Sequence, residues 1–136
     1  MRYSIIDKLS KPQIYDLYNL YQKEWWTKDR KKDDIDIMLE NSDIIEGIED
    51  SDHHLIGFAR VLTDFVYKAM IFDVIVDKKY RDNGLGKILI ENILNHKQLS
   101  KVKHFELYCL DDMKDYYRKF GFNDISNTLT LLRKSN

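Results

Sequence analysis

The sequence is poor in several features, and each shortage excludes a class of protein. It contains one cysteine, Cys109, so no disulfide can form within the chain, which favours a reducing compartment. No apolar run reaches the roughly 18 residues of a membrane span, and the N-terminal stretch lacks the apolar centre of a signal peptide. A formal net charge of −1 provides no field of one sign for nucleic acid or an anionic membrane. We therefore expect a single soluble cytoplasmic domain over residues 1–136.

The pattern of apolar residues predicts an α+β domain around a mixed sheet of about seven strands, flanked by about four helices. Ser10 and Pro12 suit the first turn of a helix, because serine caps free N–H groups and proline tolerates that turn. The stretch 68–76 is almost wholly apolar and is predicted to be a central strand, with Asp73 as the one charge inside it. The expected order is strand 3–6, helices from 10 and 33, strands 44–50, 54–62 and 68–76, a helix from 85 to about 96, strand 104–110, helix 111–120 and two closing strands around Asn127.

Two of the five glycines, Gly84 and Gly86, stand where a predicted strand gives way to a predicted helix, beside Arg81 and Lys87. Glycines there let the backbone approach a ligand, and the free N–H groups at a helix start attract an anion. The spacing excludes the P-loop pattern G-x-x-x-x-G-K-[ST], and Leu89 stands where a dinucleotide fingerprint needs its third glycine. A phosphate-binding turn of the form R-x-x-G-x-G and an ordinary strand–helix turn both remain open.

A family resemblance bears on that choice. The pattern V-x-x-x-Y-R-x-x-G-x-G-K, residues 76–87, resembles motif A of the GCN5-related N-acetyltransferases (GNAT family), which follows a buried strand. DYYRKFGF, residues 115–122, resembles that family's second signature, an aromatic residue followed by Tyr-x-x-x-Gly-Phe. GFARVLTD, residues 57–64, further resembles a bacterial subgroup of small single-domain members. The element order is similar too, so the resemblance covers essentially the whole chain and implies the GNAT fold, with acetyl-CoA as cosubstrate.

The resemblance implies a coenzyme A site beside strand 68–76. Backbone groups of Val74, Ile75 and Val76 would bond the pantetheine arm, and one N–H there would polarise the thioester carbonyl. The pyrophosphate would lie on the glycine turn and its neighbours, which are Arg81, Asp82, Asn83, Gly84, Leu85, Gly86 and Lys87.

Two residues are candidates for the proton transfers. Tyr117 matches the tyrosine that serves the family as general acid toward the departing thiolate. Proton transfer from a phenol of pKa about 10 to a thiolate whose conjugate acid has a pKa of about 8.5 is uphill by about 2 kcal/mol, unless the site helps. Asp73 lies next to the thioester-binding backbone and is the candidate base. The alternatives are a packing role for Tyr117 and a structural role for Asp73, bonded to backbone or to Arg60.

The resemblance places the acceptor site near the first two helices and the hairpin strands. Trp25 falls on the apolar stripe of the first helix and is predicted to be core, whereas Trp26 lies off it and is a candidate for the acceptor mouth. Arg60 and Asp64 are further candidates, with a surface ion pair as the alternative. The charges of Asp64 and Asp73 favour a small cationic amine.

Other polar residues have plainer interpretations. His53 and His54 fall at a hairpin turn, and the sequence lacks the spacing of a metal-binding pair, so we predict no metal site. Cys109 is expected to be a packing thiol on a buried strand. The run KDRKK, residues 28–32, is followed at once by two aspartates, which favours a solvated face over nucleic-acid binding.

The sequence thus predicts an N-acetyltransferase that moves an acetyl group directly from acetyl-CoA to a primary amine of a small cationic molecule. Three alternatives stay open: a CoA-binding sensor or scaffold without catalysis, a transferase acting on protein lysines or N-termini, and a nucleic-acid-binding domain. We expect neither a nucleic-acid nor a membrane partner. The closing stretch TLTLLRK, residues 128–134, could pair across a two-fold axis in a homodimer.

Overall fold

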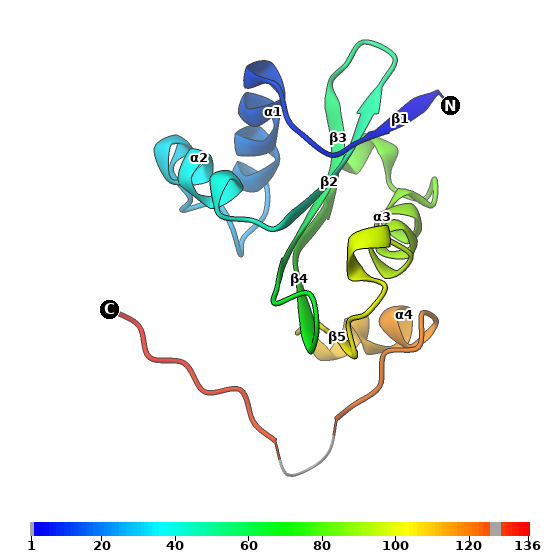
Figure 1. The fold of residues 1–136 in the computed structure, drawn as a ribbon. Coiled ribbons are helices and arrows are strands. Elements are labelled where there is room, and N and C mark those ends of the chain that lie inside the picture. Colours follow the sequence, from blue (N-terminus) through cyan, green and yellow to red (C-terminus); the bar gives the residue numbers. More distant parts are fainter. Residues whose placement is uncertain (1, 126–128) are drawn as a thin grey trace.

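The computed structural model describes residues 2–125 and 129–136, which form a five-stranded mixed sheet with helices on both faces (Figure 1). Strands β1 to β4 pair as antiparallel neighbours in chain order, and β5 joins β4 in parallel. The elements are β1 (Tyr3–Ile6), α1 (Lys11–Gln22), α2 (Lys32–Glu40), β2 (Ile44–Asp50), β3 (Leu55–Thr63), β4 (Lys68–Val76), η1 (Lys78–Tyr80), α3 (Leu85–Leu94), η2 (Lys97–Leu99), β5 (His104–Glu106), η3 (Asp111–Met113) and α4 (Lys114–Arg118). The predicted α+β class with a mixed sheet and four α-helices is confirmed. None of the described helices is long and apolar enough to cross a membrane.

The first helix begins where the sequence predicts because Ser10 and Gln13 cap it reciprocally. Gln13 N donates to Ser10 Oγ at 3.3 Å, and Ser10 N donates to Gln13 Oε1 at 3.0 Å. Pro12 occupies the first turn, where its missing N–H costs no hydrogen bond. The amide of Gln13 also donates to Glu49 of β2 at 2.5 Å. This cap fixes the start of α1 against the sheet.

Helices cover the two faces of the sheet (Figure 1). On one face, Leu17 and Tyr21 of α1 and Ile35 of α2 pack against Phe58 and Ile75. On the other face, the buried residues of α3 pack against strands β2, β3 and β4; this cluster contains Ile44, Ile48, Val61, Ile71, Leu85, Leu89, Ile90 and Ile93. Because successive strand residues point to opposite faces, a strand covered on both faces must be largely apolar, as residues 69–76 are apart from Asp73.

A β-bulge interrupts the pairing of β3 with β4. Two residues of β4, Asp73 and Val74, stand opposite the single residue Ala59 of β3. Asp73 has a φ of 58°, a left-handed conformation that aspartate tolerates better than most residues do. The bulge turns the Asp73 side chain toward α1 and the loop that follows it, where its partners lie.

The sheet opens between β4 and β5. Their parallel ladder joins Lys68–Met70 to His104–Glu106, and among the described residues it goes no further. From Phe72 to Val76, β4 therefore presents a free edge that leads to the glycine turn at the start of α3. This opening is the feature of the fold that positions a candidate site.

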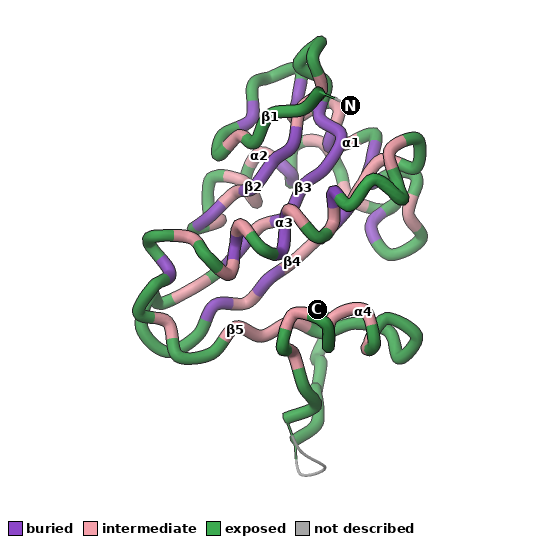
Figure 2. The backbone as a smooth tube through the Cα atoms, turned by 90° about the vertical axis from the view of Figure 1, so that its right-hand side faces the viewer, coloured by how far each residue is buried: buried purple, intermediate pink, exposed green. Residues whose placement is uncertain are grey.

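The C-terminal part is looser than the sequence predicts. The strand expected over 104–110 spans only His104–Glu106, and the helix expected over 111–120 divides into η3 and α4. Asn127, the expected centre of two closing strands, lies outside the described residues, and 129–136 form no strand. The sheet thus has five described strands instead of about seven. After Leu99 no described residue is fully buried, as Figure 2 shows for β5, α4 and the C-terminal segment.

Candidate active site

The glycine turn leaves the start of α3 open. Gly84 caps the helix with a φ of 74°, and a Cβ at this position would meet only open space, so the turn is unobstructed. The first N–H groups of a helix have no intrahelical acceptor, and the helix dipole adds positive potential there. Lys87 is exposed on the same turn and pairs only loosely with Glu91, at 3.8 Å. Leu85 between them is buried and anchors the turn in the core.

The residues before the glycines hold the turn in place. Arg81 donates through Nε to the carbonyl of Val76 at 3.1 Å and through Nη2 to Glu24 Oε1 at 2.5 Å. Asn83 donates to the carbonyl of Tyr80 at 3.0 Å. Asp82 is exposed and has a φ of 69°. The Arg81 side chain thus ties the glycine turn to the loop after α1, a contact that no local sequence pattern indicates.

Gly86 brings α4 close to the glycine turn. A Cβ at this position would lie 2.8 Å from the hydroxyl oxygen of Tyr116, too close for any real contact. From the sequence, Gly86 is expected to let the backbone approach a ligand. In the structure its missing side chain makes room for Tyr116.

The free edge of β4 offers backbone groups to an extended ligand. Asp77 N donates to the carbonyl of Ile56 in β3 at 2.9 Å, so Asp77 faces the paired edge. Because neighbouring strand residues alternate, the backbone groups of Val76 and Val74 face the open edge. The side chain of Ile75 is buried in the core under α1. Two residues of this stretch therefore have the orientation that pairing with an added strand requires.

Tyr117 lies in α4 with its ring among aromatic neighbours. It makes edge-on contacts with Tyr116, at a centroid distance of 5.1 Å, and with Phe122, at 6.1 Å. Burial, reinforced by Tyr116 and Cys109, raises the pKa of Tyr117 to about 12. The phenol is therefore protonated at neutral pH and can donate a hydrogen bond.

Asp73 is the centre of a buried ionic cluster. Its carboxylate accepts from Arg30 through two hydrogen bonds of 2.6 and 3.0 Å, from Arg60 Nε at 2.8 Å and from the Tyr21 hydroxyl at 2.9 Å. The Asp73 side chain is 5% exposed, against 13% for Arg60 and 32% for Arg30. The Arg30 guanidinium also stacks over the Tyr21 ring, 4.7 Å from its centroid.

The two arginines determine the charge state of this cluster. Burial would raise the pKa of Asp73, but hydrogen bonds and charges of Arg30 and Arg60 outweigh it and lower the pKa. Burial next to the Asp73 charge raises the pKa of Tyr21, which stays a neutral donor. A carboxylate with a lowered pKa and three donors is a weak base. The contacts favour the structural alternative for Asp73, and its role as general base stays a prediction.

The structure separates the predicted acceptor residues. Trp26 is 41% exposed on the loop between α1 and α2, where a substrate could reach it. Arg60 points to Asp73 and is nearly buried. Asp64 lies in the β3–β4 turn, at the end of β4 remote from the glycine turn, and accepts the N–H groups of Val66 and Tyr67 at 3.0 and 2.8 Å. Both carboxylates that favoured a cationic amine are thus engaged within the protein.

Two sequence predictions are wrong, and a third is wrong for one residue of its run. Trp25 is 68% exposed rather than core, because α1 ends at Gln22 and its apolar stripe ends with it. Cys109 is exposed rather than packed, because it follows the short β5. Arg30 belongs to the charged run 28–32, yet it binds Asp73 instead of facing solvent. A lone charge in an apolar strand does signal the need for a counter-ion, but nothing local points to Arg30, 43 residues away.

Residues 11–122 match the family model described as the Acetyltransferase (GNAT) family. The chain belongs to the GNAT acetyltransferase family. It is 30% identical over 112 residues to the uncharacterized N-acetyltransferase ycf52 of Pyropia yezoensis, which covers 80% of this chain and 64% of that protein. It is also 30% identical over 119 residues to Histone acetyltransferase TAP1 of Glycine max, covering 80% and 51% of the two chains.

The GNAT fold recurs in a solved structure from Xanthomonas campestris pv. campestris, with a TM-score of 0.85 and 23% identity over 100% of this chain and 94% of that one. Similarity at this identity shows the fold alone. The chain spans about half to two thirds of the length of the curated relatives named above. The GNAT match includes the glycine turn and Tyr117 but stops before the C-terminal segment.

Proposed function

We propose that this GNAT chain transfers an acetyl group directly from acetyl-CoA to a primary amine. The observation that carries the proposal is the opening of the sheet, where β4 parts from β5 beside an unobstructed glycine turn. One free strand edge and one anion-binding helix start, connected by a few residues, match the two polar parts of coenzyme A. The pantetheine amides require strand-like hydrogen bonds, and the pyrophosphate requires N–H donors and positive charge.

In this proposal the pantetheine arm pairs with Val74 and Val76, and the pyrophosphate binds the first turn of α3 with help from Lys87. The amine nitrogen attacks the thioester carbonyl carbon, the carbon–sulfur bond breaks, and the amine loses a proton. An N–H on the free edge of β4 stabilises the oxygen as it gains negative charge. The orientation of these backbone groups and the exposure of Lys87 support this arrangement.

Tyr117 acts in this proposal as a hydrogen-bond donor to the departing thiolate. With a pKa of about 12, full proton transfer to a thiolate whose conjugate acid has a pKa near 8.5 is uphill by about 5 kcal/mol. A donated hydrogen bond requires no such transfer, and it is available because the phenol is neutral. The thiolate is then stabilised while it leaves and takes its proton from solvent.

Asp73 is assigned a positioning role, since it holds Arg30 and Arg60 next to the bulge that shapes the free edge of β4. With Asp73 saturated by donors, water is the simplest acceptor for the proton of the attacking amine. Trp26 remains our candidate for the acceptor mouth, because the ion pair of Glu24 with Arg81 keeps its loop beside the glycine turn. A relative named as a histone acetyltransferase makes protein lysine the second candidate acceptor.

The experiment is a measurement of free CoA thiol released from acetyl-CoA with a panel of amines. The panel contains polyamines, aryl-alkyl amines, amino sugars, amino acids and lysine peptides, so that cationic and anionic acceptors are both represented. Tyr117→Phe tests the hydroxyl, and Tyr67→Phe is the matched control, because it removes the same atom from an exposed tyrosine of the β3–β4 turn. Calorimetry measures CoA binding of each protein.

We expect an acceptor to release thiol with the wild type and Tyr67→Phe, and Tyr117→Phe to reduce kcat by about 10- to 100-fold, the usual range for one proton-handling group. Thiol release that Tyr117→Phe leaves unchanged would refute the role of the hydroxyl. CoA binding without release from any amine would favour the sensor or scaffold function. Absence of CoA binding would overturn the proposal as a whole.

A further inference from the structure

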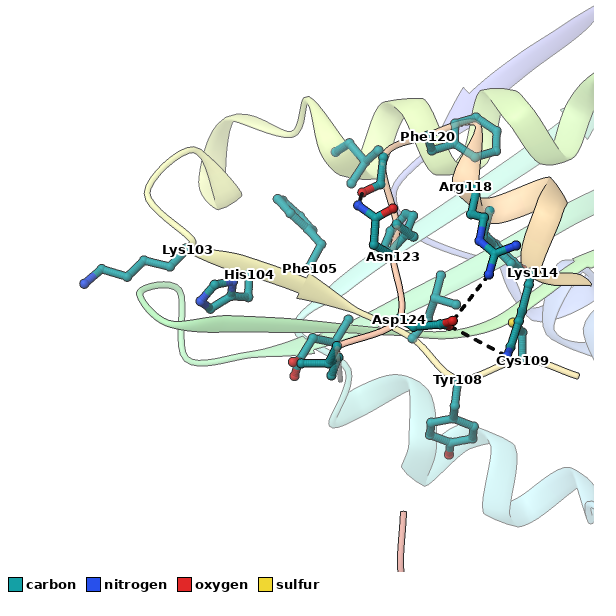
Figure 3. Close-up of a pocket in the computed structure, with 17 residues that line it drawn as sticks. Lys103, His104, Phe105, Tyr108, Cys109, Lys114, Arg118, Phe120, Asn123 and Asp124 are labelled. Carbon is teal, nitrogen blue, oxygen red and sulfur yellow. Dashed lines mark hydrogen bonds and ion pairs between the residues drawn. The ribbon is translucent and has the colours of Figure 1, made fainter. Parts of the chain in front are cut away.

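Beside the opening between β4 and β5, an arginine and two aromatic rings gather on the face of the sheet that α1 covers. Arg60 and Phe72 are partners in the β3–β4 ladder, and the Arg60 guanidinium carbon lies over the Phe72 ring, 4.9 Å from its centroid. Ile71 packs against the core under α3, so its neighbour Phe72 points to the opposite face. Across the opening, Tyr108 contacts Phe72 edge-on at a centroid distance of 6.0 Å, and Figure 3 shows its ring pointing away from α4. We call Arg60, Phe72 and Tyr108 the Arg60 patch.

The ionic cluster next to this patch carries more positive than negative charge. Arg30 and Arg60 both pair with Asp73, and among the ion pairs of the described residues neither arginine has a second carboxylate. Arginine stays protonated in proteins and Tyr21 is a neutral donor, so two guanidinium charges face the single charge of Asp73. A partly buried positive charge without a counter-ion is unfavourable, and an anion bound beside the arginines would compensate it.

Arg60 also has hydrogen-bond donors that the described part of the chain does not use. Its side chain makes one hydrogen bond there, from Nε to Asp73 at 2.8 Å, whereas Arg30 donates to Asp73 through both Nη atoms. Of the described side chains, only Glu46 has a fully buried polar atom without a partner, so Nη1 and Nη2 of Arg60 reach solvent. Two parallel N–H groups of a guanidinium match the two oxygens of a carboxylate.

The position of these donors fits the proposed acetyl transfer. Asp73 holds Arg60 and directly precedes Val74, whose backbone faces the free edge of β4 where the thioester is proposed to bind. Adjacent Cα atoms are about 3.8 Å apart, so a carboxylate on Arg60 would bring an amine of the same small molecule close to that edge. Phe72 is half-buried and Tyr108 is 55% exposed, so both rings have accessible surface for the apolar part of an acceptor.

We propose that the acceptor amine also bears a carboxylate, as a free amino acid does, and that Nη1 and Nη2 of Arg60 bind this carboxylate beside Phe72 and Tyr108. The inference rests on the proposed acetyl transfer, and it gives the acceptor a negative group where the sequence favours a cationic molecule. The nitrogen–carbon bond forms, the carbon–sulfur bond breaks and the amine proton goes to water, as in that transfer. A carboxylate matches the one excess positive charge, whereas a phosphate monoester carries about two negative charges.

The first test compares acceptors that differ by one carboxylate. Release of CoA thiol from acetyl-CoA by the wild type is measured with phenylalanine and phenethylamine, tyrosine and tyramine, and leucine and isoamylamine. We expect kcat/KM to be about 10- to 100-fold higher for the amino acid of each pair, as the loss of one hydrogen-bonded charge implies.

The outcomes separate this inference from the proposed function. Equal values within the pairs, or higher values for the amines without a carboxylate, overturn the inference and leave the acetyl transfer intact. A higher kcat/KM for phosphoethanolamine than for every amino acid also overturns it, in favour of a phosphate-bearing acceptor. Absence of thiol release with any amine overturns the proposed function and the inference together.

A second test assigns the preference to Arg60. Arg60→Gln removes the guanidinium charge and should abolish the difference between amino acid and amine, while kcat/KM for the amine changes little. Arg60→Lys keeps a charge beside Asp73 without the paired Nη atoms, so it should fold even where Arg60→Gln does not, and it should lower the same ratio. Lys68→Gln is the control, because it removes a positive charge at the start of β4, where Lys68 pairs with Glu106.

The ratio of the two kcat/KM values distinguishes binding from a structural role of Arg60. A structural role would lower both values together and leave the ratio unchanged, which would overturn the assignment. Lys68→Gln should keep the wild-type ratio, and a fall equal to that of the Arg60 variants would attribute the preference to the overall charge of the protein instead. Thermal denaturation checks that each variant is folded.

Discussion

Around Asp73, two guanidinium groups and a phenol converge on one carboxylate, and the cluster lies between α1 and the sheet with little exposed surface. Around Tyr117, aromatic rings surround a cavity, α4 has five residues, and no described residue from there to the C-terminus is fully buried. The two regions flank the same opening between β4 and β5. The Asp73 carboxylate has hydrogen-bond partners on both oxygens, whereas the aromatic side chains around Tyr117 are only partly covered.

The difference shows where this protein has room for ligands and partners. The Asp73 carboxylate contributes rigidity, because moving it would leave the charges of Arg30 and Arg60 without their partner. The partly exposed aromatic residues around Tyr117 contribute little rigidity, and a ligand or partner that covers them would bury additional apolar surface. In the proposed function, the Asp73 cluster therefore positions the site, whereas the glycine turn, the free edge of β4 and the region of Tyr117 bind ligands.

The largest expected effect is on the Asp73 cluster. Asp73→Asn keeps the shape but removes the charge, which leaves Arg30 and Arg60 without a counter-ion. We expect the free energy of unfolding to fall by about 3 kcal/mol, measured by urea denaturation. Asp64→Asn, at an exposed turn, should change it much less than Asp73→Asn does. Wild-type stability of Asp73→Asn combined with loss of activity would instead support Asp73 as the general base.

One buried carboxylate lacks the hydrogen-bond partners that Asp73 has, and it belongs to Glu46 of β2. Among the described side chains, its Oε2 is the one buried oxygen or nitrogen without a hydrogen-bond partner, and the residue is 5% exposed. Burial, reinforced by the charge of Asp7, raises the pKa of Glu46 to about 7. The folded protein therefore binds this proton more tightly than the unfolded chain, whose glutamate titrates near 4.3.

The raised pKa of Glu46 makes the free energy of unfolding depend on pH. The contribution of the protonated Glu46 is complete below pH 4.3 and is lost as pH rises through about 7, up to about 3 kcal/mol in total. The measurement is the denaturation midpoint between pH 4.5 and 8. Glu46→Gln has no proton to lose, so its curve should lie flatter than that of the wild type. Parallel curves for the two proteins would contradict the assignment.

The contact of Gly86 with Tyr116 connects the two halves of the site. Alanine at 86 gains about 1 kcal/mol of helix propensity, but its Cβ meets the Tyr116 hydroxyl. We expect Gly86→Ala to stabilise the protein only in a Tyr116→Phe background, with a coupling of about 1 kcal/mol in the double-mutant cycle. Thermal denaturation of the four proteins measures it. Additive effects would mean that the Tyr116 hydroxyl moves aside at no cost.

The smallest expected effect concerns the ion pair of Glu24 with Arg81. Because Arg81 is exposed, Glu24→Gln should lower stability by less than about 1 kcal/mol. Its clearer signature is functional, since a looser loop after α1 should raise KM for the acceptor more than KM for acetyl-CoA. Glu91→Gln, which removes the partner of Lys87 on the other side of the turn, is the control. A rise in KM for acetyl-CoA alone would place Glu24 with the cofactor site instead.

Much of the fold is readable from local patterns. Ser10 with Pro12, the apolar run 68–76 and the glycine turn each predict an element that the structure contains. These signals are local because helix caps, strand alternation and tight turns depend on residues a few positions apart. The glycine turn also carries part of the family resemblance, which the family match over residues 11–122 confirms.

The sequence by itself determined the element order as far as β5, the family and the positions of the glycine turn and Tyr117. Only the tertiary structure decided that Arg30 neutralises Asp73, that Gly86 accommodates Tyr116, and that the leucines of residues 129–132 find no cover in their own sheet. Each of these depends on segments that are distant along the chain and meet only after folding. A buried charge or a glycine in the sequence indicates that another residue must lie next to it. The packing of the whole chain decides which residue that is.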